Sequence, residues 1–167
     1  AAESLARIGI TGGFSFMYAL PGETNDDIKE TFRLIQRLYK IHPDSYIFGP
    51  AIFRPYPGNS LYDLCVEKGF PEKRKLDDWD KTYERAWGFA EMEDYKWVEK
   101  PDELPYVGFY GKLAYLGVNK GSGWLMGNIQ KVLSIVAKWR FENDFYLLPV
   151  EHILFIKIMP VLQLLKW

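Results

Sequence analysis

Residues 14–62 read FSFMYALPGETNDDIKETFRLIQRLYKIHPDSYIFGPAIFRPYPGNSLY, and this stretch decides the fold. It begins with an alternation in which every second residue from Phe14 to Leu20 is large and apolar. Side chains that alternate with a period of two are typical of a strand with one buried face. Pro21-Gly22 then ends the strand, because this dipeptide favours a turn.

A helix is predicted directly after this turn, over residues 24–41. Thr24 has an N-cap side chain, and Asp27 stands three residues later in a capping-box arrangement. The helix should end near residue 41, because Pro43 disfavours helical geometry at the residue before it. Apolar residues at helical spacing predict one buried stripe, formed by Ile28, Phe32, Ile35 and Leu38.

Residues 44–53 predict a second strand, so the stretch forms a strand–helix–strand unit with parallel strands and a right-handed crossover. Gly49-Pro50 lies inside this strand. Since proline cannot donate to a sheet ladder, we expect an edge strand or a bulge here. A sheet of two parallel strands needs neighbours and cover on both faces, which predicts further strands upstream of residue 1.

The C-terminal part of the chain predicts helices rather than strands. Residues 124–142 are expected to be helical, and Pro149 opens a last apolar helix that runs to the C-terminus. Pro101 and Pro105 predict a linker-like break, and residues 117–123 predict a flexible joint.

Composition excludes several classes of function. The chain has 167 residues, of which 48% are hydrophobic, so a folded core is expected. With 21 basic and 22 acidic residues the net charge is −1, which leaves no field to attract nucleic acid. Cys65 is the single cysteine, and His42 and His152 lie far apart in sequence. We therefore expect neither an internal disulfide nor a zinc or iron–sulfur site within this chain.

The two ends of the sequence bear on the cellular location of the protein. The chain starts with Ala1 and shows no charged-then-apolar signal segment, so we interpret it as a piece of a longer cytoplasmic protein. The last helix is apolar nearly all round, but Glu151, His152 and Lys157 interrupt it. No transmembrane span is therefore expected. A buried helix, or one that docks on the missing half, fits better than a membrane-bound one.

Two loops follow the predicted strands and give the strongest functional signal. Residues 20–24 read LPGET, and residues 53–62 read FRPYPGNSLY. The second loop precedes a short helix predicted over residues 61–68, with Ser60 as its N-cap and Gly69 at its end. Each loop follows a strand and precedes a helix, so both should lie at the carboxyl end of a parallel sheet, where α/β folds bind ligands.

These motifs resemble the radical S-adenosylmethionine enzymes. The pair FMYALPGET and FRPYPGNSLY is most similar to the branch with a cobalamin-binding domain, which includes Mg-protoporphyrin monomethyl ester cyclases and methyltransferases. The resemblance implies an α/β fold in which residues 1–75 form the last two βα units of a partial (β/α)6 barrel. Residues 76–167 would be a mainly α-helical C-terminal extension, in which AKWRFENDFYLLPVE, residues 137–151, is similar to a helical element of the same branch.

The resemblance also implies cofactors and partners. A radical enzyme of this kind uses S-adenosylmethionine and a 4Fe-4S cluster, and it generates a 5′-deoxyadenosyl radical for methyl transfer or oxidative modification of a small-molecule substrate. The C-x3-C-x2-C triplet that ligates the cluster would lie upstream, in the missing N-terminal half of the protein, and a cobalamin domain further upstream. We therefore expect the chain alone to be inactive.

The family pattern points to seven cofactor-binding residues. Apolar and main-chain contacts to the adenosyl group are implied for Met17, Tyr18, Phe53, Pro55 and Tyr56, with Glu23 and Arg54 as polar candidates at the same rim. Two positions depart from the pattern, since Ala19 replaces the usual glycine and Asn59 the usual threonine.

Simpler interpretations stand beside these roles. Met17 can fill the barrel interior, Glu23 can satisfy the helix end, and Arg54 can pair with a surface acid. Cys65 is predicted to be a buried small hydrophobe, and His42 and His152 are given no catalytic role. The aromatic stretch 79–110 can be a lid over a planar substrate or the packing of a helical cap.

Two alternatives to an enzyme remain open from the sequence. One is a non-enzymatic helical interaction module that keeps a remnant of the strand–helix–strand unit. The other is a carbohydrate-binding or transferase domain that uses the aromatic stretch as a stacking surface.

Overall fold

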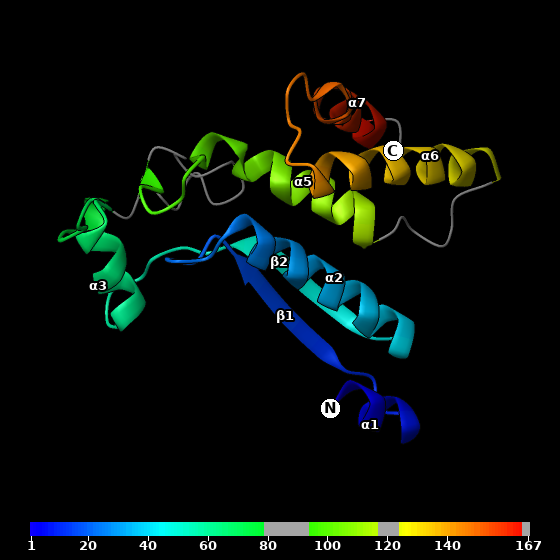
Figure 1. The fold of residues 1–167 in the computed structure, drawn as a ribbon, viewed down its shortest axis with the longest axis horizontal. Helices are drawn as coiled ribbons and strands as arrows, with labels where there is room; N and C mark the ends of the chain where they lie inside the picture. Colours follow the sequence, from blue (N-terminus) through cyan, green and yellow to red (C-terminus); the bar gives the residue numbers. More distant parts are fainter. Residues whose placement is uncertain (79–93, 117–123, 165–167) are drawn as a thin grey trace.

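The computed structural model describes residues 1–78, 94–116 and 124–164 of the chain. Figure 1 shows a strand–helix–strand unit, a helical layer above it and the short helix α3 set apart at one end. In chain order the elements are α1 (Ala2–Arg7), β1 (Gly13–Tyr18), α2 (Asn25–Ile41), β2 (Tyr46–Ile52), α3 (Ser60–Glu67), the 3-10 turn η2 (Pro101–Glu103), α5 (Leu104–Tyr115), α6 (Trp124–Glu142) and α7 (Val150–Leu164).

The strands β1 and β2 pair in parallel, as the sequence predicted. Ser15 pairs with Phe48, but the next pair joins Met17 to Ala51, so β2 carries one extra residue in this interval. The extra residue lies at Gly49-Pro50, where a bulge or an edge strand was expected. A Cβ at Gly49 would stand 2.4 Å from the carbonyl oxygen of Phe16, so only glycine fits there.

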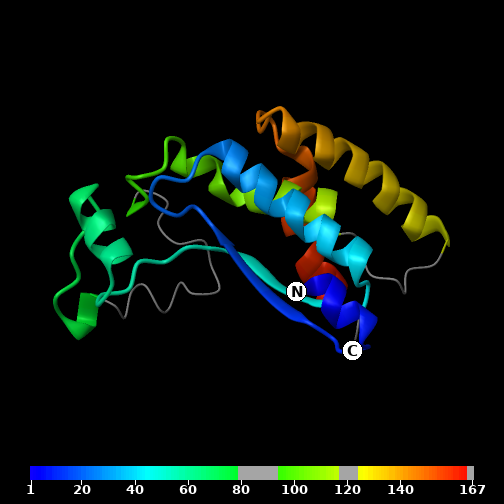
Figure 2. The same ribbon diagram turned by 60° about the horizontal axis from the view of Figure 1, so that its bottom comes forward.

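Helix α2 covers one face of the two strands (Figures 1 and 2). Its N-cap is Thr24, and the reciprocal hydrogen bonds with Asp27 complete the predicted capping box. It ends at Ile41 with His42 as C-cap, which confirms the expected boundary. The predicted apolar stripe is buried in full, at Ile28, Phe32, Ile35 and Leu38.

The opposite face of the strands is open to solvent along much of its length. Met17, Tyr46 and Phe48 are 48%, 66% and 61% exposed. Parallel sheets are normally covered on both faces, because their crossover helices pack on either side. Among the described residues β1 and β2 form a sheet of two strands, so each strand also has an unpaired edge.

The N-cap of α3 corrects one prediction. Asn59, rather than Ser60, has the extended backbone of a cap, and its Oδ1 accepts a hydrogen bond from the backbone N–H of Tyr62 at 3.0 Å. Ser60 becomes the first helical residue instead. Asparagine and serine are comparable caps, so residue type alone does not distinguish the two neighbours.

The linker-like break predicted at Pro101 and Pro105 is wrong. Pro101 lies in the first turn of η2, and Pro105 lies in the first turn of α5. Proline fits these positions because the first N–H groups of a helix have no partner within it. The two prolines therefore start a helical segment rather than end one. The joint predicted over residues 117–123 lies outside the described residues.

Helices α6 and α7 agree with their predicted positions. Helix α6 spans Trp124–Glu142, and α7 begins at Val150, directly after Pro149. In the part of the chain that the structure describes, none of the helices combines the length and the hydropathy that crossing a bilayer requires.

One hydrophobic core joins the strand–helix–strand unit to the helical layer, across the boundary expected between residues 75 and 76. Phe32 of α2 is fully buried, and its ring centroid lies 5.0 Å from that of Phe141 in α6. Helix α5 lies against the same residues through two glycines. A Cβ at Gly111 would stand 2.6 Å from Cζ of Phe32, and one at Gly108 would stand 2.2 Å from the hydroxyl of Tyr18.

Polar links reinforce this contact. Lys29 of α2 is 6% exposed, and its Nζ lies 2.6 Å from Oδ2 of Asp144 in the turn after α6. Arg33 pairs with Glu142, which also accepts a hydrogen bond from the hydroxyl of Tyr115. A buried ammonium needs a partner, so Lys29 and Asp144 fix how α2 sits under α6.

The close approach at Gly111 can be tested by adding a methyl group. In an ordinary helix interior, glycine to alanine stabilises by about 1 kcal/mol. We expect Gly111→Ala to lower the free energy of unfolding by about 1–3 kcal/mol instead, because the new Cβ overlaps the Phe32 ring. Urea unfolding followed by circular dichroism measures this change. In a Phe32→Leu background the penalty should shrink, and stabilisation by Gly111→Ala in both backgrounds would contradict the contact.

Candidate functional site

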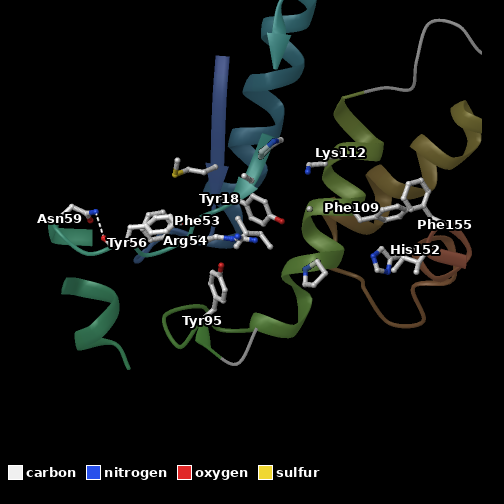
Figure 3. Close-up of a pocket in the computed structure, with 17 residues that line it drawn as sticks. Tyr18, Phe53, Arg54, Tyr56, Asn59, Tyr95, Phe109, Lys112, His152 and Phe155 are labelled. Atoms are coloured by element: carbon white, nitrogen blue, oxygen red, sulfur yellow. Dashed lines mark hydrogen bonds between the residues drawn. The ribbon is translucent and has the colours of Figure 1, made fainter. Parts of the chain in front are cut away.

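A cleft of about 850 Å³ lies between the carboxyl ends of the two strands and the helices α5 and α7 (Figure 3). Its walls are mostly apolar and aromatic, with a few polar groups. The residues that line it are Met17, Tyr18, Pro50, Ala51, Ile52, Phe53, Arg54, Tyr56, Asn59, Tyr95, Pro105, Gly108, Phe109, Lys112, His152, Phe155 and Ile156.

Five of the seven residues expected from the family pattern line this cleft. They are Met17, Tyr18, Phe53, Arg54 and Tyr56. The first two end β1, and the other three follow β2, so the carboxyl ends of the two parallel strands bring them to one place. Met17 points to the open face of the sheet and is 48% exposed, which leaves it accessible from the cleft.

Tyr18 combines a place in the wall with a structural role. Its ring is buried, and its hydroxyl donates a hydrogen bond to the carbonyl oxygen of Leu104 at 3.2 Å. Burial, and to a lesser extent the neighbouring Tyr95, raises the pKa of the Tyr18 phenol well above its usual value. The phenol therefore stays neutral and holds the start of α5 against the end of β1.

Glu23 and Pro55 are not part of the cleft lining. Oε2 of Glu23 accepts a hydrogen bond from the backbone N–H of Leu20 at 3.1 Å, so its carboxyl group closes the turn after β1. Burial raises the pKa of Glu23, and the backbone hydrogen bonds from Leu20 and Ala19 oppose this effect. Pro55 is a buried residue of the loop after β2. The simpler interpretation of Glu23, satisfaction of the helix start, does not agree with this geometry, because Thr24 and Asp27 cap α2 and Glu23 bonds within the turn before it.

Arg54 and Tyr95 face each other across the middle of the cleft. Figure 3 shows the Tyr95 hydroxyl pointing toward the Arg54 side chain. Burial raises the pKa of Tyr95 to about 12, although the positive charge of Arg54 acts in the opposite direction. The loop that carries Arg54 is held by Asn59, whose Nδ2 donates to the carbonyl oxygen of Tyr56 at 3.0 Å.

Helices α5 and α7 supply seven lining residues, and of these only Phe109 is an aromatic residue of the stretch that was considered as a lid. The seven are Pro105, Gly108, Phe109 and Lys112 of α5 and His152, Phe155 and Ile156 of α7. One signal was present, since Lys112 is the only charged residue in the sequence of α5. His152 packs against rings, with its centroid 4.9 Å from Phe109, and burial lowers the pKa of its imidazole. It is a wall residue with a neutral ring.

The aromatic stretch is only partly described, since residues 79–93 lie outside the described ranges. Within the described part, Tyr95 is 3% exposed, and Nε1 of Trp97 donates to the carbonyl oxygen of Ala19 at 2.8 Å. The Tyr95 and Trp97 rings lie 4.9 Å apart, so these two side chains pack over the end of β1.

The described residues do not fit an iron–sulfur cluster. No group of three or more His, Cys, Asp or Glu side chains is arranged to hold a metal within residues 1–78, 94–116 and 124–164. Cys65 is fully buried, as expected, and burial raises the pKa of its thiol to about 11, so the thiol is protonated at neutral pH. His42 has a structural place, since its Nε2 lies 3.0 Å from the carbonyl oxygen of Ile10.

Comparison of the chain with models of protein families, with curated proteins and with solved structures gave no match. The site is therefore interpreted from its residues and geometry. What these define is an apolar and aromatic cleft with cationic groups at the carboxyl end of two parallel strands, the usual place for a ligand in an α/β fold.

The role of Glu23 can be tested through the pH dependence of stability. A carboxyl group whose pKa is raised on folding stabilises the protein at low pH, and this contribution is lost as the pH rises through the folded pKa. We therefore expect Glu23→Gln to gain stability relative to wild type as the pH rises from about 4 to 7. Urea unfolding at each pH gives the difference, with Glu67→Gln on α3 as the matched control. If the stability of Glu23→Gln relative to wild type falls as the pH rises, burial is not the dominant effect on the pKa of Glu23.

Proposed function

We propose that this chain forms the C-terminal part of a radical S-adenosylmethionine enzyme and builds one wall of its cofactor and substrate pocket. One observation carries the proposal. The two stretches that resemble this superfamily, residues 16–24 and 53–62, bring five of the seven expected residues to one cleft. Met17 and Tyr18 come from the end of β1 and Phe53, Arg54 and Tyr56 from the loop after β2, whereas none of residues 20–24 lines the cleft.

The open sheet supports the same proposal. Tyr46 and Phe48 expose large apolar side chains on the face that would point into a barrel, and both described strands have an unpaired edge. Exposed edges and an uncovered face are unfavourable for a parallel sheet. Additional strands from the N-terminal half of the same protein would pair with these edges and close the barrel.

The cleft residues fit an adenosyl group. Met17, Phe53 and Tyr56 offer apolar and aromatic surface to the adenine ring, and Arg54 offers a donor to ribose or carboxylate oxygens. When bound and reduced by a 4Fe-4S cluster, S-adenosylmethionine supplies a radical that abstracts hydrogen from a substrate. The residues of this chain bind and orient the adenosyl group and exclude water. The cluster ligands, and any cobalamin domain, belong to the upstream half.

The reaction proposed for the complete protein is methyl transfer or oxidative modification of a small organic molecule. The N-terminal half of the same protein is the partner that completes the site. The working location proposed is the cytoplasm, because the cluster chemistry requires reducing conditions.

The decisive test is the coding sequence upstream of Ala1 followed by assay of the longer protein. We expect an in-frame C-x3-C-x2-C triplet there. A protein that includes it should form 5′-deoxyadenosine from S-adenosylmethionine under reducing, anaerobic conditions, whereas the present chain alone should form none. An upstream start codon without cysteines, or turnover by the present chain alone, would overturn the proposal.

Variants of the longer protein then test the cleft itself. Tyr56→Ala removes an aromatic surface at the proposed adenine site, so we expect KM for S-adenosylmethionine to rise about five- to tenfold. Tyr39→Ala is the matched control, because Tyr39 lies on α2 and is not part of the cleft lining. Equal effects of the two substitutions would contradict the placement of the cofactor.

A second candidate is the helical interaction module, which one observation favours. Val132, Ile135, Val136 and Trp139 are exposed on α6 and follow the spacing of a single helix face. Such a stripe normally packs on another surface. This candidate predicts that the chain alone is a stable monomer, whereas the enzyme proposal predicts association through open strand edges. Sedimentation velocity distinguishes the two outcomes.

A further inference from the structure

The charges that line the cleft are unbalanced. Its lining contains Arg54 and Lys112 but no aspartate or glutamate. Elsewhere in the described residues, basic side chains that reach the interior meet an acid. Lys29 pairs with Asp144, and Arg140 lies 3.2 Å from Glu151. Lys112 therefore introduces a positive charge into a lining whose described residues include no acid.

Lys112 is an exposed residue of the cleft wall. It extends from α5 toward the ends of the strands, into the space between the two walls (Figure 3). The described residues offer it no ion pair or hydrogen bond. Partial removal of water lowers the pKa of its amine, since the charged form loses hydration beside the apolar walls. An anion placed next to Lys112 would stabilise the charged amine in place of the water that it has lost.

The same cleft offers flat, apolar surface on α5 and α7. Phe109 lies one turn before Lys112 on α5, and its ring centroid is 5.3 Å from that of Phe155 and 4.9 Å from that of His152. The three rings come from two helices and line the cleft together. A cleft of about 850 Å³ is large enough for a ligand with one or more fused rings.

From this juxtaposition we infer that the α5–α7 side of the cleft binds a planar aromatic anion. Its negative group pairs with Lys112, and its ring packs on Phe109 and Phe155. S-adenosylmethionine fits this side less well, because its sulfonium gives it an overall positive charge. The identification of the anion as the substrate rests on the proposed function, whereas the binding itself does not.

The test compares two ligands that differ in charge and share one ring system. Titration calorimetry of the 167-residue chain with 1-naphthoate and with 1-naphthamide measures the preference for the anion. We expect naphthoate to bind about five- to tenfold more tightly at low salt, and the difference to shrink as salt is added. Equal affinities, or a preference for the neutral amide, would overturn the inference.

Variants assign the preference to one residue. Lys112→Met keeps an unbranched side chain, one atom shorter, but removes its charge. Naphthoate should then bind no better than naphthamide, and the affinity for naphthamide should stay unchanged. Lys112→Arg should keep the preference. Lys131→Met, which removes an exposed lysine from α6, is the matched control and should change neither affinity. Circular dichroism verifies that each variant is folded.

The outcomes are independent of the enzyme proposal. A preference for naphthoate that survives Lys112→Met would place the anion elsewhere and overturn this inference, while the upstream cysteine triplet and the effect of Tyr56→Ala would remain as they are. Absence of the triplet would overturn the enzyme proposal but leave the naphthoate preference and its loss in Lys112→Met intact.

Discussion

The structure depends on how closely helix α5 approaches the strand–helix–strand unit. Gly108 and Gly111 leave no side chain between α5 and the rings of Tyr18 and Phe32, so the helix axis lies against them directly. This contact decides where the rest of α5 points. Because Phe109 lies between the two glycines and Lys112 follows them, the same contact places both side chains in the cleft. Packing and ligand site are therefore set by one short segment.

Helix α7 depends on a second constraint, the buried guanidinium of Arg140. It donates to Glu151 and to the carbonyl oxygens of Phe145, Leu147 and Leu148, so it binds the turn between α6 and α7 from inside. Glu151 also accepts a hydrogen bond from Tyr110 of α5 at 2.9 Å. One arginine thus joins three helices, and through them it determines where the α7 wall of the cleft lies.

Local signals predicted the strand–helix–strand unit well, because each acts over a few residues. The Thr24–Asp27 capping box and the bulge at the proline in β2 can each be predicted from a few adjacent residues. Helix α5 was missed for a physical reason. It is apolar nearly all round and contains two glycines, so it lacks both a polar face and a strong helix propensity. The half of the cleft beyond β1 and β2 could not be predicted, since it depends on the packing of α5 and α7 over residues far away in sequence.

The bulge in β2 has a consequence for how this segment can change over evolutionary time. Residues on a strand alternate between two faces, and the extra residue at Gly49-Pro50 exchanges the faces for everything after it. Loss of one residue at Gly49-Pro50 would remove the bulge but leave Ala51 paired with Met17 and Ile52 paired with Tyr18, on the faces that they have now. A deletion of one residue elsewhere in β2 would instead move side chains to the opposite face, so the bulge is the position at which this strand can change length without changing the cleft.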